Sequence, residues 1–572
     1  MAAIAKESSA TFAPSGRSRE LRLLIRLLLL SLILRLLAMF LLPLIPEEAY
    51  YWLYAKHPAP SYFDHPPMVA WIIRLGTFLF GDSALGVRAV NMLLSFAASF
   101  ALYRFGRIWF SRGAALLAAA AIQILPVYFG IGLLATMDAA LLLFWCATLW
   151  AISAAVHSRQ GQTSATDNGP RTTDNGGPAI LPWYFAGLFL GLTLLSKYTA
   201  IFLPLGVLLV LLIDRPFRRQ LLSPHPYLAL LLALAIFSPV LIWNRRHDWI
   251  SFRFQFLQRG GGRPANAASF GEFLALQLAV LTPTLLVALL AILARLLARK
   301  GAAAPSSARR RPRFLRPRYF FALAFSLPLL GALTLKSLHE IHINWTAPAY
   351  LSILPAAAHL FLAHARLRRR RIDGFHWRPA IFITAIVCIL CNIAFVLYAL
   401  TLQPHLPLLA NMLGPWRPLA ATVEAQVWKL EKETGRTPLV ITADKFHLAA
   451  ILAFYRDEIF EQAETSAGDG RPLLHTAINS PIHTTTGRWI LNQQYSPADA
   501  LAFPYWIYRD WHGADCIYVD SGPIKTNALA ASFDTIEILP APIQTSNPPN
   551  HRYYLAIGHG LKAHTTAGVD GK

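Results

Sequence analysis

The stretch from Glu47 to Trp71, EEAYYWLYAKHPAPSYFDHPPMVAW, follows directly on the first long apolar run of the chain. It combines two adjacent carboxylates and an acid next to a histidine with many tyrosines, tryptophans and prolines. A belt of Tyr and Trp at a membrane surface accounts for the aromatic residues. It does not account for Glu47, Glu48 or the Asp64-His65 pair, because ionisable groups are costly at a membrane. We therefore expect a binding or catalytic site here.

The composition indicates a multi-pass membrane protein. The chain has 572 residues, 55% hydrophobic and 14% charged, and its mean hydropathy is +0.43. A membrane-spanning helix needs about 20 apolar residues, and we predict about 11 such helices before residue 403, the first three at about 21–45, 85–103 and 114–129. The net charge of +22 comes from arginines clustered in short loops between apolar runs, which is typical of cytosolic loops rather than of nucleic-acid binding.

The order of apolar and polar stretches predicts the domain organisation. Residues 1–20 form a cytosolic tail, and residues 21–402 form a membrane module with a large first outer loop, 46–84. Residues 158–179 are low in complexity and are predicted to be a disordered cytosolic linker. Residues 403–572 read as a small extracytoplasmic α/β domain, with strands such as 439–442 and 516–519.

The positions of the charged residues and of the cysteines predict the orientation of the chain and argue against a disulfide framework. With the N-terminus in the cytosol, the basic loops fall inside and the loops that carry acids and histidines fall outside. The four cysteines do not form a disulfide framework, since three of them lie within apolar runs. Function is therefore expected on the outer face of a cell (inner) membrane.

Polar residues from distant outer loops are expected to converge there. These residues are Glu47, Glu48, Asp64, His65, Asp138, Lys197, Tyr198, the arginines of 245–263, and Lys336 to Trp345. An enzyme that takes a sugar from a polyprenyl-phosphate carrier needs such a set. A carboxylate deprotonates the acceptor hydroxyl, cations hold the departing phosphate, and aromatic walls contact sugar and lipid.

Several motifs in these loops resemble one known family. They are Glu47-Glu48-Ala-Tyr-Tyr-Trp, Tyr62-Phe63-Asp64-His65-Pro66-Pro67, Thr136-Met137-Asp138-Ala139, Ser238-Pro239-Val-Leu-Ile-Trp243-Asn244 and Asn344-Trp345-Thr-Ala-Pro348-Ala-Tyr350. The chain is similar to the family 39 glycosyltransferases, which are GT-C enzymes of the protein O-mannosyltransferase and lipid A aminoarabinose transferase type. The resemblance covers most of residues 20–460.

The resemblance implies an inverting transfer from a polyprenyl-phosphate-linked sugar to a lipid, glycan or protein acceptor of the cell envelope. It implies catalytic roles for Glu47, Glu48 and Asp138, with Glu47 as the base where these enzymes usually have Asp. Asp64 matches a metal-binding position, so a divalent metal is a candidate cofactor. The residues expected to contact substrate or phosphate are Tyr51, Tyr62, His65, Lys197, Tyr198, Arg259, Lys336 and His342.

Structural readings of the same residues stay open. Asp138 also suits a helix N-terminus, Lys197 a lysine that snorkels to the interface, and His342 a solvated loop. Two other functions compete with the glycosyltransferase. A lipid or solute transporter would use the same charges, but the chain lacks the halved repeat typical of transporters. A scaffold built around residues 403–572 leaves the acidic first loop without a role.

Overall fold

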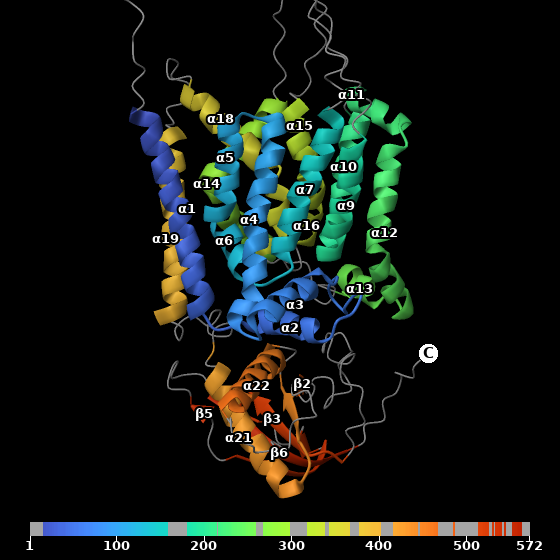
Figure 1. Cartoon of the computed structure of the whole chain (residues 1–572), viewed down its shortest axis with the longest axis vertical. Helices are drawn as coiled ribbons and strands as arrows, with labels where there is room; N and C mark the ends of the chain where they lie inside the picture. Colours follow the sequence, from blue (N-terminus) through green and yellow to red (C-terminus); the bar gives the residue numbers. More distant parts are fainter. Residues whose placement is uncertain are drawn as a thin grey trace, which may run out of the picture.

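The computed structural model is a bundle of long helices with a mixed sheet at one end (Figure 1). Helices α2 and α3 lie across this end, between the bundle and the sheet. The residues that the structure describes are 15–157, 180–213, 215–258, 267–297, 317–337, 343–366, 377–401, 414, 416–443, 447–466, 484–486, 513–524, 529–530, 532–539, 543–544 and 552–562. The predicted linker 158–179 lies outside them.

Helices account for nearly all of the described residues before 402. The first part of the chain contains α1 (Ser15–Leu41), α2 (Pro46–Lys56), α3 (Met68–Phe80), α4 (Ala84–Trp109), α5 (Arg112–Ile124), α6 (Pro126–Leu133), α7 (Asp138–His157), α9 (Leu181–Ser196), η1 (Tyr198–Ile201), α10 (Phe202–Ile213), α11 (Arg215–Arg218) and η2 (Arg219–Leu222). The second part contains α12 (His225–Arg246), α13 (Ile250–Arg253), η3 (Phe254–Gln258), α14 (Ala267–Leu297), α15 (Pro317–Ala324), α16 (Leu327–Lys336), η4 (Ile343–Thr346), α17 (Ala347–Tyr350), α18 (Ile353–Arg366) and α19 (Trp377–Thr401).

The chain has the apolar helices of a multi-pass membrane protein. Five helices in the described part are long and apolar enough to cross a membrane, or up to eight if each bent pair counts as one span. Further apolar helices are shorter, among them α3 and α9. Our figure of about 11 spans stays a prediction. The first predicted span, 21–45, is wrong in extent, because α1 ends at Leu41 and the next helix turns by 74°.

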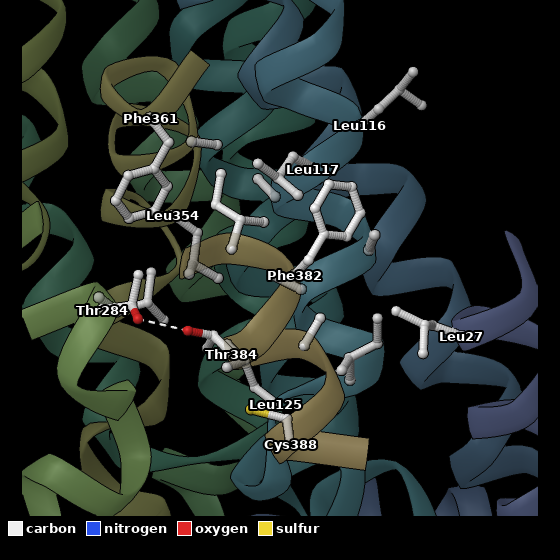
Figure 2. A pocket seen from close by; sticks show the side chains of 18 of the residues that line it. Leu27, Leu116, Leu117, Leu125, Thr284, Leu354, Phe361, Phe382, Thr384 and Cys388 are labelled. Carbon is white, nitrogen blue, oxygen red and sulfur yellow. Dashed lines mark hydrogen bonds between the residues drawn. The ribbon is translucent and has the colours of Figure 1, made fainter. Parts of the chain in front are cut away.

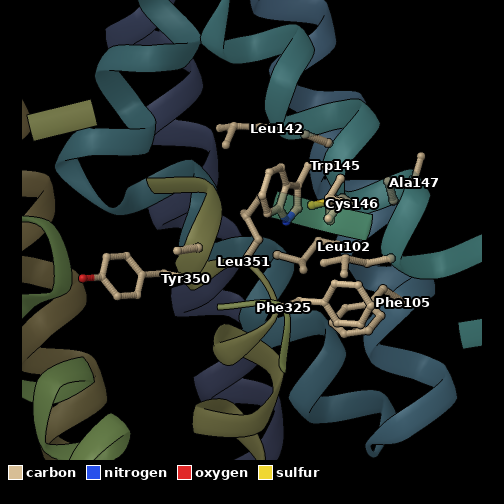
Figure 3. Packing of buried hydrophobic residues seen from close by; sticks show 14 of the residues in the cluster. Leu102, Phe105, Leu142, Trp145, Cys146, Ala147, Phe325, Tyr350 and Leu351 are labelled. Carbon is tan, nitrogen blue, oxygen red and sulfur yellow. The ribbon is translucent and has the colours of Figure 1, made fainter. Parts of the chain in front are cut away.

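The bundle is held by close packing of apolar side chains. Figure 3 shows Trp145 of α7, Phe105 of α4 and Phe325 of the turn between α15 and α16 within one buried cluster. Glycine and alanine allow two helix backbones to approach each other more closely still. A Cβ added at Gly187 of α9 would lie 2.4 Å from the carbonyl oxygen of Ala229 in α12, so the two backbones are in contact. Such packing is the main source of helix association where lipid removes the hydrophobic driving force.

The single span predicted for 114–129 is broken into α5 and α6, which meet at 64°. The break frees backbone carbonyls inside the membrane region, where each needs a donor. Arg35 donates to the carbonyls of Gln123 (3.4 Å) and Tyr128 (3.2 Å), and Asn392 donates to that of Ile124 (2.9 Å). Arg35 is fully buried and pairs with no carboxylate among the described residues. Its side chain therefore stabilises the break between α5 and α6 from inside the bundle.

The C-terminal sheet is mixed. It contains β1 (Leu439–Thr442), β2 (Thr484–Thr486), β3 (Cys516–Asp520), β4 (Phe533–Ile538), β5 (Ile543–Gln544) and β6 (Arg552–Leu561), in the order β2-β1-β3-β6-β4 with β5 beside β6. β1 runs parallel to β2 and β3, and β6 is antiparallel to β3 and β4. Helices α21 (Trp416–Thr434) and α22 (His447–Ser466) accompany it. The predicted strands at 439–442 and 516–519 are present, and all four cysteines are free.

Candidate active site

The acidic pair is carried by α2, which begins at Pro46. Proline at the first helical position costs no hydrogen bond, and the Glu48 carboxylate accepts the backbone N–H of the capping residue Ile45 at 3.1 Å. Successive residues of a helix point about 100° apart. Glu47 is accordingly exposed, whereas Glu48 is fully buried. The two neighbours therefore occupy different environments.

Glu48 is locked in place by Arg88 of α4. The guanidinium donates from Nε to Glu48 Oε1 at 2.8 Å and from Nη2 to Oε2 at 2.5 Å, which is a bidentate pair. Arg88 also donates to the carbonyls of Leu42 and Pro43, both at 2.8 Å. The backbone N–H of Ala135 completes the set, donating to Glu48 Oε1 at 2.8 Å. This group, the Glu48–Arg88 knot, joins α2, α4, the α1–α2 linker and the loop before α7.

Glu47 lies one position away on the open face of α2. The hydroxyl of Tyr51, one turn later on the same helix, donates to Glu47 Oε1 at 3.1 Å. The Tyr51 ring also meets the His65 ring edge to face, with centroids 5.7 Å apart. The predicted base is therefore exposed, and it sits on a helix that the Glu48–Arg88 knot fixes.

Asp64 lies in the loop after α2 and is buried among tyrosines of α2. Its Oδ1 accepts from Tyr50 Oη at 3.3 Å and from Tyr54 Oη, and its Oδ2 lies 3.5 Å from His65 Nε2. Burial, followed by the charge of Asp64, raises the pKa of Tyr54 well above its usual range. Tyr54 therefore stays protonated and donates to Asp64. This arrangement ties the loop after α2 back onto the helix.

The rest of that loop is held from a distant part of the chain. Ser251 of α13 donates to the carbonyl of Tyr62 at 2.7 Å, and the Gln255 side chain donates to that of Asp64. The Tyr62 hydroxyl donates to the Tyr54 carbonyl of α2 at 2.8 Å, and the two rings stack with centroids 3.9 Å apart. Tyr198 lies against the loop through Ser61, with 3.4 Å between the hydroxyls. The predicted residues Tyr62 and Tyr198 are thus near the acidic helix.

Asp138 begins α7 and is the centre of a second polar cluster. Its Oδ1 accepts from Lys197 Nζ at 2.7 Å, and its Oδ2 accepts from Asn344 Nδ2 at 2.6 Å. Asp138 is 1% exposed and Lys197 is 11% exposed. Lys197 therefore forms an ion pair rather than snorkelling. We call Asp138, Lys197 and Asn344 the Asp138 cluster. It lies at the same end of the bundle as α2, because Ala135 contacts Glu48 three residues earlier.

Other predicted residues fall outside these clusters. Lys336 at the end of α16 lies over the Trp345 ring, 5.2 Å from its centroid. Arg259 and His342 lie outside the described residues. Sequence reasoning missed Arg88, whose signal was a charge inside an apolar span. It also gave Asn344 no role, although Asn344 stands in one of the motifs quoted above.

Asp64 was also predicted as a metal ligand. Among the residues that the structure describes, no three His, Cys, Asp or Glu side chains are grouped so that they could hold a metal ion. The Asp64 carboxylate accepts hydrogen bonds from Tyr50 and Tyr54, and His65 lies beside it. The metal role of Asp64 therefore stays a prediction.

A large cavity of the bundle lies away from the acidic residues. Its volume is about 320 Å³, and α1, α5, α14, α18 and α19 line it. Figure 2 shows a wall of apolar side chains, including Leu27, Leu117 and Phe361, in which Thr284 and Thr384 are hydrogen-bonded to each other at 2.5 Å. Because its polar groups satisfy one another, this cavity is suited to hydrocarbon and not to the chemistry of a sugar.

Comparison with known proteins bears on the whole arrangement. Residues 64–164 and 179–243 match the family described as dolichyl-phosphate-mannose-protein mannosyltransferase. The lipid A galacturonosyltransferase RgtD of Rhizobium johnstonii is 24% identical over 316 residues, which are 54% of this chain and 58% of that protein. The chain thus spans little more than half the length of this relative.

Solved structures share the fold across nearly the whole chain. The apo structure of ArnT from Cupriavidus metallidurans aligns with a TM-score of 0.54 and 15% identity, covering 95% of this chain and 98% of that one. The structure of the same protein bound to undecaprenyl phosphate aligns with a TM-score of 0.52 and 14% identity, covering 94% and 98%. The fold and the matched residues together confirm the resemblance to the GT-C membrane glycosyltransferases that the sequence motifs predicted.

Proposed function

We propose that this protein is an inverting glycosyltransferase that moves a sugar from a polyprenyl-phosphate carrier to an acceptor hydroxyl at the outer face of the cytoplasmic membrane. Its N-terminus is then cytoplasmic, and residues 403–572 are extracytoplasmic. The observation that carries the proposal is the environment of Glu47, an exposed carboxylate next to a fully buried and paired one. A general base must reach its substrate while its helix stays fixed.

In the proposed reaction Glu47 takes the proton of the acceptor hydroxyl. The acceptor oxygen forms a bond to C1 of the sugar while the bond from C1 to the phosphate oxygen breaks. The electron pair of that bond leaves with the polyprenyl phosphate, and the configuration at C1 inverts. Tyr51, which donates to Glu47 at 3.1 Å, orients the carboxylate before the reaction.

The departing phosphate gains negative charge and needs cations or donors. We assign this task to Lys197 and Lys336, with His65 contributing when it is protonated. Lys197 starts from an ion pair with Asp138 at 2.7 Å, so Asp138 positions it. Asn344 holds the other Asp138 oxygen at 2.6 Å and limits its rotation.

For the substrates, we propose a hexose or pentose donor and a lipid acceptor in preference to a protein or glycan. The choice of a lipid rests on the name of the relative RgtD, which acts on lipid A. The undecaprenyl phosphate bound to ArnT supports a carrier of this class, because that protein shares the fold. Tyr62 and Tyr198 would contribute to the aromatic walls of the site.

The test is transfer of radiolabelled sugar from undecaprenyl-phosphate donors to a membrane extract by the purified protein. We expect label in the lipid fraction, and we expect Glu47→Gln to lower transfer by about a hundredfold or more, because general bases contribute on this scale. The expression level and thermal unfolding of the variant should match the parent, since the Glu47 side chain is exposed.

The matched control is Glu433→Gln, which removes one carboxylate from an exposed position of α21. It should leave transfer unchanged. Full transfer by the Glu47 variant would assign the base to another residue. The absence of label from every fraction, together with donor-dependent uptake into vesicles, would instead support the transporter.

A further inference from the structure

Helix α22 of the C-terminal region packs directly against α2, the helix that carries Glu47 and Glu48. The contact has an apolar centre, where the Trp52 and Phe454 rings meet edge to face with centroids 5.1 Å apart. Trp52 is fully buried and Phe454 is 2% exposed. The C-terminal region is therefore in van der Waals contact with the acidic helix.

A second contact lies at the start of α2. The backbone N–H of Leu44, in the short linker between α1 and α2, donates to the Tyr455 hydroxyl at 3.0 Å. Burial raises the pKa of Tyr455 to about 12, so the side chain stays neutral at ordinary pH. A buried backbone N–H needs an acceptor. Tyr455 supplies it three residues before Glu47.

A third contact lies at the far end of α2. The Lys56 ammonium forms ion pairs with Asp82 at 2.7 Å and with Asp457 of α22 at 3.1 Å. Burial lowers the pKa of Lys56, but the hydrogen bond to Asp82 and the charges of Asp457 and Asp82 outweigh this and raise it. Lys56 therefore stays charged and joins α22 to the turn before α4.

The α22 helix is itself fixed within the C-terminal region. Arg456 donates from Nε to Glu424 of α21 at 2.5 Å, and both side chains are 2% exposed. Three consecutive residues of α22 therefore make contacts in two directions. Tyr455 and Asp457 contact the α2 region, and Arg456 binds α22 to α21. A rigid C-terminal region can hold both ends of α2.

We infer that α22 is a positioning element for the active site, with Tyr455 and Asp457 fixing the two ends of the helix that presents Glu47. The inference rests on the proposed function for its catalytic consequence. It gives the C-terminal region a role that the sequence left open. A displacement of about 1 Å at a reacting group can cost up to a hundredfold in rate, so a modest loosening of α2 should be measurable.

The test compares Asp457→Asn with Glu458→Gln in the full-length protein. The two variants remove one negative charge each, at neighbouring positions of α22. Asp457 pairs with Lys56 of α2, whereas Glu458 pairs with Arg417 of α21 at 3.8 Å. We expect Asp457→Asn to lower kcat about tenfold while KM for the carrier-linked sugar changes less than twofold, because α2 is loosened and the donor contacts remain. Asp457→Glu should restore most of kcat.

Hydrogen exchange supplies a readout that does not depend on catalysis. Residues 44–56 should exchange faster in Asp457→Asn and in Tyr455→Phe, whereas β1 and β3 should be unchanged. Unchanged exchange in 44–56 together with parental kcat would overturn the inference. If the parent protein transfers no sugar, the proposed function fails, but faster exchange of 44–56 would still establish that α22 restrains α2.

Discussion

Two carboxylate–cation pairs lie at the same end of the bundle, and they differ in how completely they are enclosed. Glu48 and Arg88 are both 0% exposed, and four N–H groups, two from Arg88 and two from the backbone, donate to the Glu48 carboxylate. In the Asp138 cluster, each oxygen accepts from one side chain, and Lys197 is 11% exposed. The first pair is enclosed by backbone, whereas the second can exchange partners.

Under the proposed function, this difference separates a charge that stabilises the fold from one that takes part in transfer. A buried ion pair is weak evidence for stability as such, but removing one partner leaves an uncompensated charge. The Glu48–Arg88 knot joins four segments through backbone groups, so damage to it should be global. The Asp138 cluster depends on side chains alone, so damage there should be local and should affect transfer more than folding.

The largest effect is expected when the knot is broken. Arg88→Leu leaves the Glu48 carboxylate buried without its cation and deprives the Leu42 and Pro43 carbonyls of their donors. We expect a loss of about 3–5 kcal/mol in the free energy of unfolding. Thermal unfolding of the purified protein in detergent, together with its yield, measures this loss.

A double variant tests the physical reason. Adding Glu48→Gln to Arg88→Leu removes the buried charge while keeping an acceptor for the Ile45 or Ala135 amide. It should recover part of the lost stability. A double variant that is no more stable than Arg88→Leu alone would show that packing rather than charge dominates at this site.

The Asp138 cluster should respond in the opposite way. Asp138→Asn keeps the shape of the side chain but removes the charge that positions Lys197. We expect transfer to fall by about tenfold to a hundredfold, while the free energy of unfolding changes by about 1 kcal/mol, less than in Arg88→Leu. Sugar-transfer assays and thermal unfolding on the same preparations provide the comparison.

Lys197 provides the matched pair of variants. Lys197→Met should reproduce the loss seen with Asp138→Asn, and Lys197→Arg should retain more activity because it keeps the cation. If Asp138→Asn unfolds as readily as Arg88→Leu, the distinction between an enclosed pair and an exchangeable pair is wrong.

Much of the fold could be predicted because it depends on local sequence. The apolar run predicted at 85–103 lies within α4 (Ala84–Trp109), and the strand predicted at 439–442 matches β1. The acidic first loop could also be singled out as a candidate site from local sequence, since carboxylates after an apolar run have few structural explanations. These signals require no knowledge of distant contacts.

The remaining features depend on partners far away in the sequence. Pro126 begins α6 directly after the break that follows α5, but Arg35 of α1 and Asn392 of α19 donate to the carbonyls that the break frees. Likewise, whether Glu47 or Glu48 would be buried could not be read from the acidic pair. Arg88, 40 residues away, decides it.

The smallest effect is expected at His57, which directly follows the last residue of α2 and is half-exposed. Burial, followed by the charge of Lys56, lowers the pKa of His57 below its usual 6.5. The unfolded chain then binds more protons than the folded one, so stability falls as pH drops through 6.5 and levels off below the folded pKa. His57→Gln should therefore lose less thermal stability than the parent between about pH 7 and pH 5. Identical pH profiles for the two proteins would show that His57 titrates alike in the folded and unfolded states, and that its partial burial at the end of α2 carries no measurable penalty.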